Sequence, residues 1–312
     1  MKQITNTILM IRPVSFRMNE QTAVNNYYQK VLDSLTPETI QFKALQEFDI
    51  FVDKLKAVGV NVIVINDTKE TDTPDSIFPN NWISFHESGD VGLYPMFAKN
   101  RRLERRDDIL DTLEELGFEI ENVIDYTSAE EEKLFLEGTG SLLLDRVNSK
   151  AYCALSPRAD EDLFIEFCEE FEYTPVPFVS NQTVDGKRLP IYHTNVIMCL
   201  GEQFSVICLD SIDDKKERKN LIKHLKEDKK EIIAITEEQV NSFSGNMLQV
   251  SGANNKRYTV MSNAAFECLT KQQINQLKKH GEILYSSLDT IEACGGGSAR
   301  CMMAEVFLPK TI

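Results

Sequence analysis

β-rich runs alternate with amphipathic helices about five times along the 312 residues, and this pattern constrains the fold more than any other feature. The fourth repeat shows it most clearly: apolar runs at 190–200 and 204–210, a helical pattern at 215–228, and a further apolar run at 230–236. The residue identities do not repeat, so only the pattern recurs. Five such units could close around a pseudo-fivefold axis and leave a central cavity. We therefore expect an α/β fold, a five-bladed β/α propeller forming a single domain over residues 1–312.

The remaining units are predicted from the same alternation, with apolar runs taken as strands and 3.6-residue periodicity as helices. The first has strands 8–13 and 60–66 around helices 22–35 and 48–58; the second has strands 82–85, 91–97 and 118–126 and helix 105–116; the third has strands 141–145, 151–156 and 174–180 and helix 160–170; the fifth has strands 246–252, 257–262 and 281–287, helix 270–280 and the tail 300–308.

Composition excludes several functional classes. With 42% hydrophobic and 27% charged residues the chain resembles an ordinary globular protein, and a net charge of −15 disfavours nucleic-acid or acidic-membrane binding. No run of 18 apolar residues and no secretory leader is evident, so a cytoplasmic location is expected. The seven cysteines form no CxxC pair and no zinc-ligand spacing, so neither a disulfide framework, a metal nor another cofactor is predicted.

A glycine run near the end of the chain is the most informative segment for chemistry. The sequence Cys294-Gly-Gly-Gly-Ser-Ala-Arg-Cys301-Met-Met precedes the last apolar run. Glycines allow the main chain to approach a ligand closely, and a cysteine at the end of such a loop can face a substrate. Taken alone, the segment fits a flexible turn with two incidental thiols better than an active site.

Two further candidates stand at the starts of apolar runs. His193, in PIYHTNVIMCL, is predicted to head a strand, where a hydrogen-bonded structural histidine is the alternative to a catalytic one. Glu137 lies in LEGTGS, where glycines on both sides of Thr139 indicate a tight turn that could bring the carboxylate to a ligand. A simple turn is the alternative for this motif.

The segment TPDSIFPNNWISF gathers polar side chains around an aromatic ring. Asp75, Asn80 and Asn81 could bind the N–H groups of a planar cation or urea, with Phe78 packed on its face. Asx turns between two elements are the alternative explanation.

In combination these motifs resemble the guanidino-group-modifying (pentein) enzymes, which include arginine deiminase, dimethylarginine dimethylaminohydrolase, N-succinylarginine dihydrolase and the amidinotransferases. PDSIFPNN resembles their PDSVFVED, LEGTGSLLL their LDGGDVLF, LSPR their LSxR, HTN their HLK or HLD, and GGGSARCM their GGG-x-x-CM. The motifs follow the family order and span the chain from Arg12 to Cys301.

The resemblance implies a five-bladed propeller and assigns a role to each motif. Cys301 matches the nucleophile, His193 the general acid/base and Glu137 the carboxylate that orients substrate. Arg101 and Arg158 match positions that hold the substrate's amino-acid carboxylate, although the first loop could align one residue later, at Arg102.

Three departures from the family pattern bear on the substrate. Asn81 and Asn195 stand where deiminases carry aspartates, and Ser141 replaces the aspartate of GGD. An amide can both donate and accept hydrogen bonds, so a ureido compound or an acylated arginine becomes a credible substrate, while the succinylarginine dihydrolases also use asparagine in this region.

The resemblance therefore implies a cysteine hydrolase that acts on the guanidino or ureido carbon of a small molecule through a covalent S-alkyl intermediate. The expected substrates are arginine, methylarginines, citrulline or acylarginines, and the enzyme could form a homo-oligomer. Because a free thiol has a pKa of about 8.5, charged His193 or the cationic substrate must activate Cys301. An amidinotransferase and an inactive arginine-metabolite binding protein are the alternatives.

Overall fold

Five three-stranded sheets and one two-stranded hairpin make up the β-structure of the computed structural model, which describes residues 1–311. In every three-stranded sheet the central strand pairs antiparallel with one neighbour and parallel with the other. The sheets are β17 (Ala304–Glu305), β1 (Thr7–Arg12) and β2 (Asn61–Asn66); β3 (Ile83–Phe85), β4 (Asp90–Leu93) and β5 (Asn122–Asp125); β6 (Leu142–Asp145), β7 (Lys150–Leu155) and β8 (Thr174–Val179); β11 (Met198–Leu200), β12 (Phe204–Ile207) and β13 (Glu231–Ala234); and β14 (Leu248–Ser251), β15 (Arg257–Ser262) and β16 (Glu282–Ser286).

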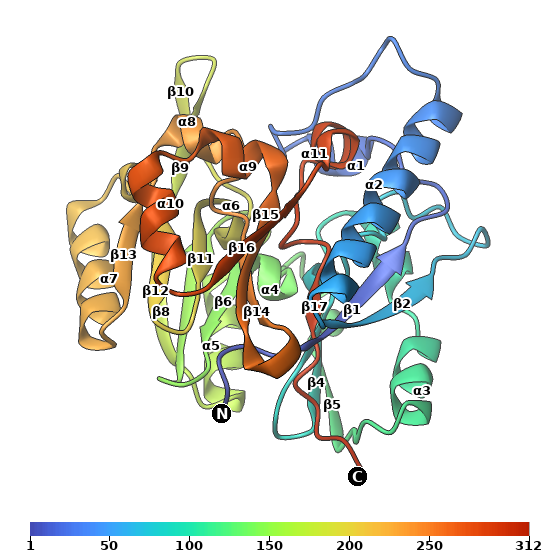
Figure 1. Ribbon diagram of the computed structural model, residues 1–312, viewed down its shortest axis with the longest axis horizontal. Coiled ribbons are helices and arrows are strands. Elements are labelled where there is room, and N and C mark those ends of the chain that lie inside the picture. Colours follow the sequence, from blue (N-terminus) through green and yellow to red (C-terminus); the bar gives the residue numbers. More distant parts are fainter. Residues whose placement is uncertain (312) are drawn as a thin grey trace.

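This recurrence confirms the predicted α/β class, and most predicted strands overlap observed ones. In each sheet, the strand that pairs antiparallel with the central strand is here called the first strand. Neighbouring sheets contact one another through these first strands: β3 contacts β17, and β11 contacts both β6 and β14. Closure of the five sheets into a propeller stays a prediction. The hairpin β9 (Asn181–Val184) and β10 (Lys187–Pro190) projects from the upper edge of the molecule in Figure 1.

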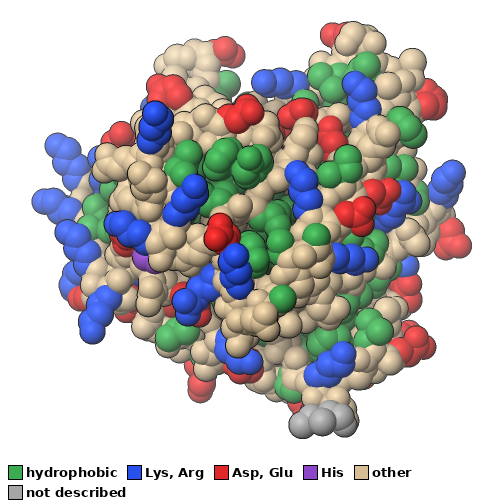
Figure 2. Space-filling model, in the orientation of Figure 1, with side chains coloured by type: hydrophobic (Ala, Val, Ile, Leu, Met, Phe, Trp, Pro, Cys, Tyr) green, Lys and Arg blue, Asp and Glu red, His purple; other side chains and the backbone are tan. Residues whose placement is uncertain are grey.

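One helix in each unit links the central strand to its parallel partner. These helices are α2 (Pro37–Ala57), α3 (Asp108–Glu115), α5 (Glu161–Glu170), α7 (Lys215–Glu227) and α10 (Lys271–Lys278). Figure 1 shows α7 and α3 at opposite outer edges of the molecule, with the sheets between them. In α7, Leu221 and Leu225 are buried four residues apart, while Lys and Arg side chains gather at the same left edge of Figure 2. The charged face of this helix therefore points to solvent.

Shorter helical turns join the units and lead into several strands. They are α1 (Glu20–Ala23), α4 (Gly138–Ser141), α6 (Thr194–Ile197), α8 (Glu237–Val240), α9 (Asn263–Cys268), α11 (Asp289–Gly295) and the 3-10 turn η1 (Pro79–Asn81), together with the 3-10 turns at Lys99–Glu104, Thr127–Glu131, Leu209–Ser211 and Ala253–Asn255. The prediction that His193 heads a strand was wrong, because His193 precedes the helical turn α6 and β11 begins only at Met198. In this turn Thr194 Oγ1 donates a hydrogen bond to the carbonyl of Ser141.

The first sheet corrects the predicted grouping of the C-terminal tail. Residues 300–308 were expected to extend the fifth unit, but β17 pairs antiparallel with β1 through Ile8↔Glu305 and Leu9↔Ala304. Ile8, Leu9 and Met10 are fully buried, so β1 has apolar side chains on both faces and requires hydrogen-bonding partners at both edges. The segment after the glycine loop supplies the second partner.

The helix predicted at 22–35 was wrong beyond its first residues. Only α1 is regular there, and the segment that follows uses its polar side chains in contacts with distant parts of the chain. Side chains of Asn25 and Asn26 compete with local helical hydrogen bonding in this way.

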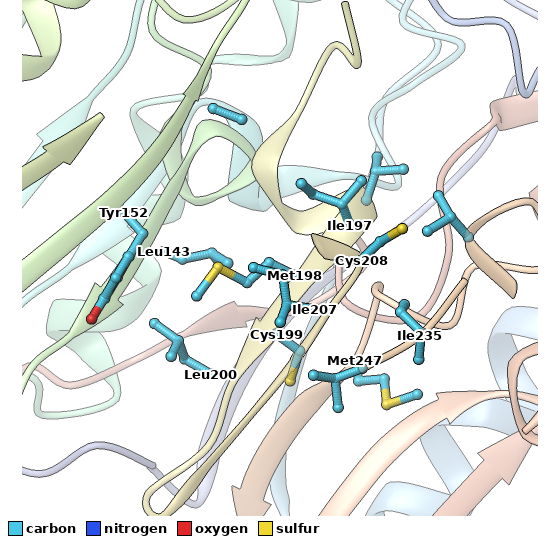
Figure 3. Packing of buried hydrophobic residues seen from close by; sticks show 14 of the residues in the cluster. Leu143, Tyr152, Ile197, Met198, Cys199, Leu200, Ile207, Cys208, Ile235 and Met247 are labelled. Carbon is cyan, nitrogen blue, oxygen red and sulfur yellow. The ribbon is translucent and has the colours of Figure 1, made fainter. Parts of the chain in front are cut away.

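Apolar side chains from consecutive units merge into large buried clusters. Figure 3 shows part of one cluster, in which Leu143 and Tyr152 of the third unit lie near Met198 and Leu200 of the fourth. Such shared packing holds the units together and fixes the turns that precede their first strands. None of the helices within residues 1–311 has both the length and the apolar character of a membrane span.

Candidate active site

Equivalent turns in the five units carry the polar residues of the site. A turn precedes the first strand of each sheet, and it contains Asn81 before β3, Glu137 before β6, His193 before β11, Asn246 before β14 and Cys301 before β17. All five side chains are buried. The turn α4, which follows Glu137, contacts both η1, which contains Asn81, and α6, which follows His193. These three turns are therefore in contact through α4.

Glu137 and His193 form a hydrogen-bonded pair. His193 Nε2 lies 2.7 Å from Glu137 Oε2, and the other carboxylate oxygen accepts the backbone N–H of Phe97 at 3.0 Å. Arg158 Nη1 lies 3.5 Å from Oε2. Glu137 is 0% exposed and His193 is 1% exposed, so the pair is shielded from water.

Burial and charge determine which of these groups are ionised. Burial is the largest influence on His193 and, with the nearby Arg158, lowers its pKa to about 4 in spite of the Glu137 carboxylate. Burial would raise the pKa of Glu137, but Arg158 and the His193 hydrogen bond outweigh it and lower that pKa to about 2. The imidazole of His193 is therefore neutral and donates to the ionised carboxylate of Glu137.

This ionisation predicts that acid destabilises the protein. Below pH 6.5 His193 is protonated in the unfolded chain, whereas in the folded chain it stays neutral down to about pH 4. Protonation of Glu137 in the unfolded chain lowers the free energy of unfolding further between pH 4.5 and about 2. Since both folded pKa values are lowered, the free energy of unfolding falls as pH falls, by about 2 kcal/mol between pH 7 and 5 from His193. Urea titrations at both pH values should show this drop, and His193→Gln should reduce it; an equal drop in the variant would contradict the assignment.

The thiol of Cys301 lies among amide groups. Its Sγ is 3.2 Å from Asn246 Nδ2 and 3.4 Å from Asn195 Nδ2. Tyr192 Oη donates to the carbonyl of Gly296, so residues on both sides of His193 contact the loop that carries Cys301. The thiol and the Glu137–His193 pair therefore border one site.

A missing side chain in α4 brings Asn81 next to His193. A Cβ at Gly140 would lie 2.5 Å from Asn81 Nδ2 and 2.8 Å from His193 Nδ1, which no side chain could occupy. Glycine at this position thus allows the amide and the imidazole to meet over α4. The glycine loop likewise packs on Phe78, whose ring would lie 2.8 Å from a Cβ at Gly295.

Asp75 brings a carboxylate with spare bonding capacity. Its Oδ2 accepts from Asn19 Nδ2 at 2.8 Å and Thr22 Oγ1 at 3.2 Å, whereas its buried Oδ1 has no hydrogen-bond partner among residues 1–311. Asn80 Nδ2 is unpartnered in the same sense. Buried polar atoms without partners next to a buried ion-pair site are expected where a ligand supplies them.

The two predicted carboxylate-binding arginines are both occupied by the protein itself. Arg101 donates to both oxygens of Glu104 at 2.9 Å and to Asn81 Oδ1 at 2.8 Å. Arg102, the alternative, instead bonds the carbonyl of Met96 and is partly exposed. Arg101 therefore orients Asn81, and a substrate carboxylate would have to compete with Glu104.

Arg158 is held by the segment that follows α1. Its Nε donates to Asn25 Oδ1 at 2.9 Å and its Nη2 to the carbonyl of Thr22 at 2.9 Å. Further along, Asn26 donates to the carbonyls of Gly295 and Gly296. Residues 19–30 thus contact both Arg158 and the glycine loop that precedes Cys301.

A cavity of about 620 Å³ lies beside residues 19–21. Leu32, Leu35 and Cys294 line it together with Asn19, whose amide also bonds Asp75. Asn19 therefore connects the cavity wall to the Asp75 carboxylate. Within residues 1–311 no three His, Cys, Asp or Glu side chains are grouped so as to hold a metal ion.

The sequence alone did not single out Asn246, Asn19 or Asn25. Asn246 begins an unremarkable apolar run, and its only signal is its place: it precedes the first strand of the fifth unit, as His193 precedes that of the fourth. Asn25 falls in the segment 22–35 that was mistaken for a helix, and Asn19 lies three residues before that segment, at the N-cap of α1.

Comparison with known proteins identifies the family. Residues 12–308 match the family model described as "N,N dimethylarginine dimethylhydrolase, eukaryotic". The chain belongs to this family. No curated protein matches the chain in a sequence search.

Solved structures share the fold of this family member at low sequence identity. The arginine dihydrolase ArgZ of cyanobacteria superposes with a TM-score of 0.74 and 18% identity over 98% of this chain and 41% of ArgZ, so the chain spans less than half of that relative. The N-terminal domain of ArgZ, in a mutant bound to substrate, gives 0.72 and 18% over 96% of this chain and 97% of that domain. A variant dimethylarginine dimethylaminohydrolase carrying S-methyl-L-thiocitrulline as an adduct gives 0.64 and 12% over 97% and 99%.

Proposed function

We propose that the chain is a cysteine hydrolase that attacks the guanidino carbon of an arginine-related small molecule. The observation that carries the proposal is the buried Glu137–His193 pair in the site that Cys301 borders. Membership of the dimethylarginine dimethylhydrolase family supports it, as do the neighbouring structures described as an arginine dihydrolase and as an adduct with S-methyl-L-thiocitrulline. We also infer that the five sheets surround a common axis, which would bring the five turns together.

In the proposed reaction the thiol proton passes to neutral His193, and the thiolate forms a bond to the guanidino carbon. The imidazolium formed is stabilised by Glu137, and it protonates the departing amine as the C–N bond breaks. Water then attacks the S-alkyl carbon, gives one proton to His193, and the C–S bond breaks to restore the thiol.

Two buried carboxylates would neutralise the substrate cation. Asp75 has an unpartnered Oδ1, and Glu137 is held ionised by Arg158 and His193. A guanidinium has parallel N–H donors that suit such oxygens, and Phe78 can pack on its planar face. The site is therefore better matched to a cation than to a neutral amide such as glutamine.

A second candidate activity, hydrolysis of a ureido group, rests on Asn81. Arg101 donates to its Oδ1, so the amide must present Nδ2 on the other side, where His193 lies. An N–H donor there can bind the oxygen of a ureido group. The enzyme could then act twice: it would first hydrolyse a guanidino group to a ureido product, and then hydrolyse that ureido product.

Replacing Asn81 with aspartate should separate the two activities. The Asn81→Asp variant loses the N–H donor and gains a charge, so we expect turnover of citrulline relative to arginine to fall about 10- to 100-fold. Steady-state rates on both substrates measure this ratio. The exposed Asn254→Asp is the matched control, and an unchanged ratio in Asn81→Asp would exclude the assigned donor role.

Product analysis tests the function itself. The purified protein is incubated with arginine, methylarginines, citrulline, agmatine and succinylarginine, and ammonia, methylamines, citrulline and ornithine are quantified. Release of amine without an added acceptor supports the hydrolase. Turnover only when a second amine is supplied would indicate an amidinotransferase, and binding without turnover of any substrate would indicate a binding protein.

A further inference from the structure

The side chain of Asn246 has a hydrogen-bonding pattern that leaves one donor for the nucleophile. Its Oδ1 accepts the backbone N–H of Arg300 at 3.0 Å, which fixes the orientation of the amide. One Nδ2 hydrogen then goes to the carbonyl of Asn195 at 3.0 Å, and the other to Cys301 Sγ at 3.2 Å. Asn246 is 1% exposed, so water cannot easily replace it.

The sulfur has few other sources of stabilisation in the empty site. Cys301 belongs to an apolar cluster with Phe78 and Met302, and an apolar environment disfavours a thiolate. His193 is neutral there, because burial lowers its pKa. Within residues 1–311 the groups that hydrogen-bond the sulfur are the amides of Asn246 and Asn195: both Nδ2 atoms donate to Sγ, and the thiol can donate to Asn195 Oδ1 at 3.7 Å.

The titratable groups around the nucleophile loop are engaged elsewhere. Tyr192 donates to the carbonyl of Gly296, and Arg300 Nη2 pairs with Glu305 at 2.7 Å. Glu292 of α11 accepts from Ser298 Oγ at 2.6 Å, and His193 pairs with Glu137. Among the described residues, none of these groups has a hydrogen bond to Sγ.

We propose that Asn246 is a further catalytic residue, whose Nδ2–H stabilises the Cys301 thiolate while its Oδ1 fixes the nucleophile loop. Asn195 assists from the second side, with Nδ2 at 3.4 Å from the sulfur. The proposal rests on the proposed function only in calling the thiolate catalytic. The stabilisation itself is a property of the empty protein.

A difference titration of the thiolate tests the proposal without any substrate. The ultraviolet absorbance of thiolates is recorded against pH for each protein and for its Cys301→Ser counterpart, and the difference isolates Cys301. Asn246→Leu removes the donor without adding charge. We expect the midpoint to rise by about one to two pH units, since a hydrogen bond to a charged group has that strength.

Asn246→Asp keeps an oxygen for the Arg300 N–H but cannot donate to the sulfur when ionised. Its carboxylate would also repel the thiolate, so a raised midpoint in this variant follows from the charge as well as from the lost donor. The neutral Asn246→Leu therefore decides: a raised midpoint in a variant with the wild-type melting temperature supports the proposal, and an unmoved midpoint in either variant overturns it.

Gln249→Glu is the matched control for a buried acid in the same strand region. Its amide bonds Glu202 and His280 and is away from the sulfur, so the midpoint should not move. Thermal melting identifies any variant that does not fold, and Asn246→Ala, which is neutral and also lacks the donor, replaces Asn246→Leu if the latter does not fold. If the midpoints shift as expected but no substrate is turned over, the proposed function fails and this inference stands. If substrate is turned over but the midpoints do not move, the proposed function stands and this inference fails.

Discussion

Cys301→Ser is expected to lower turnover of the best guanidino substrate by about 10⁴-fold or more, because removing a covalent nucleophile abolishes the intermediate. A serine hydroxyl is far less acidic than a thiol and gains too little from two amide donors to ionise. The measurement is amine release under saturating substrate, with substrate binding followed by calorimetry.

Cys294→Ser is the natural control, since Cys294 lies seven positions earlier, in the last turn of α11, just before the loop that carries Cys301. Its thiol is buried and its pKa is raised by burial, which makes it a poor nucleophile. It should keep near-normal activity. Equal losses in both variants would point to a general disturbance of the loop, and an unaffected Cys301→Ser would remove the nucleophile assignment.

Glu137→Gln should have the second largest effect. The change keeps the shape but removes the charge that holds His193 and neutralises Arg158, so we expect turnover to fall about 10²- to 10⁴-fold. Leaving Arg158 without its buried partner should also lower the free energy of unfolding by about 3 kcal/mol. Rates and urea denaturation measure the two effects separately.

Arg188 forms two partly exposed ion pairs, one with Asp213 and one with Glu237. These pairs provide a control for the effect of Glu137→Gln on rate and stability. Glu237→Gln removes a carboxylate from an ion pair in solvent, where the contribution to stability is about 0–1 kcal/mol. A similar small effect for Glu137→Gln on both rate and stability would refute its place in the site.

The repeated alternation predicted the strands and long helices because apolar period and length are local properties of the sequence. The partner of a strand is not local: nothing in residues 300–308 specifies β1 as the strand that β17 joins. The same limit explains the error at 22–35, where long-range bonds of Asn25 and Asn26 override a local helical pattern.

Candidate site residues were found where a motif combined glycines with a reactive side chain, as at Cys301 and Glu137. Asn246 has no such motif, and only the equivalence of the five turns draws attention to it. Arg101 was found, but its bonds to Glu104 and Asn81 could not be read from spacing. Geometry was needed to separate residues that could contact substrate from those that orient them.

The pairing of β17 with β1 has a consequence for how the protein acquires its reactive centre. The thiol reaches its final position only after β17 docks beside β1, and contacts so remote along the chain form slowly. During synthesis, the sulfur would therefore stay chemically idle until residues 304–305 had left the ribosome and paired with β1.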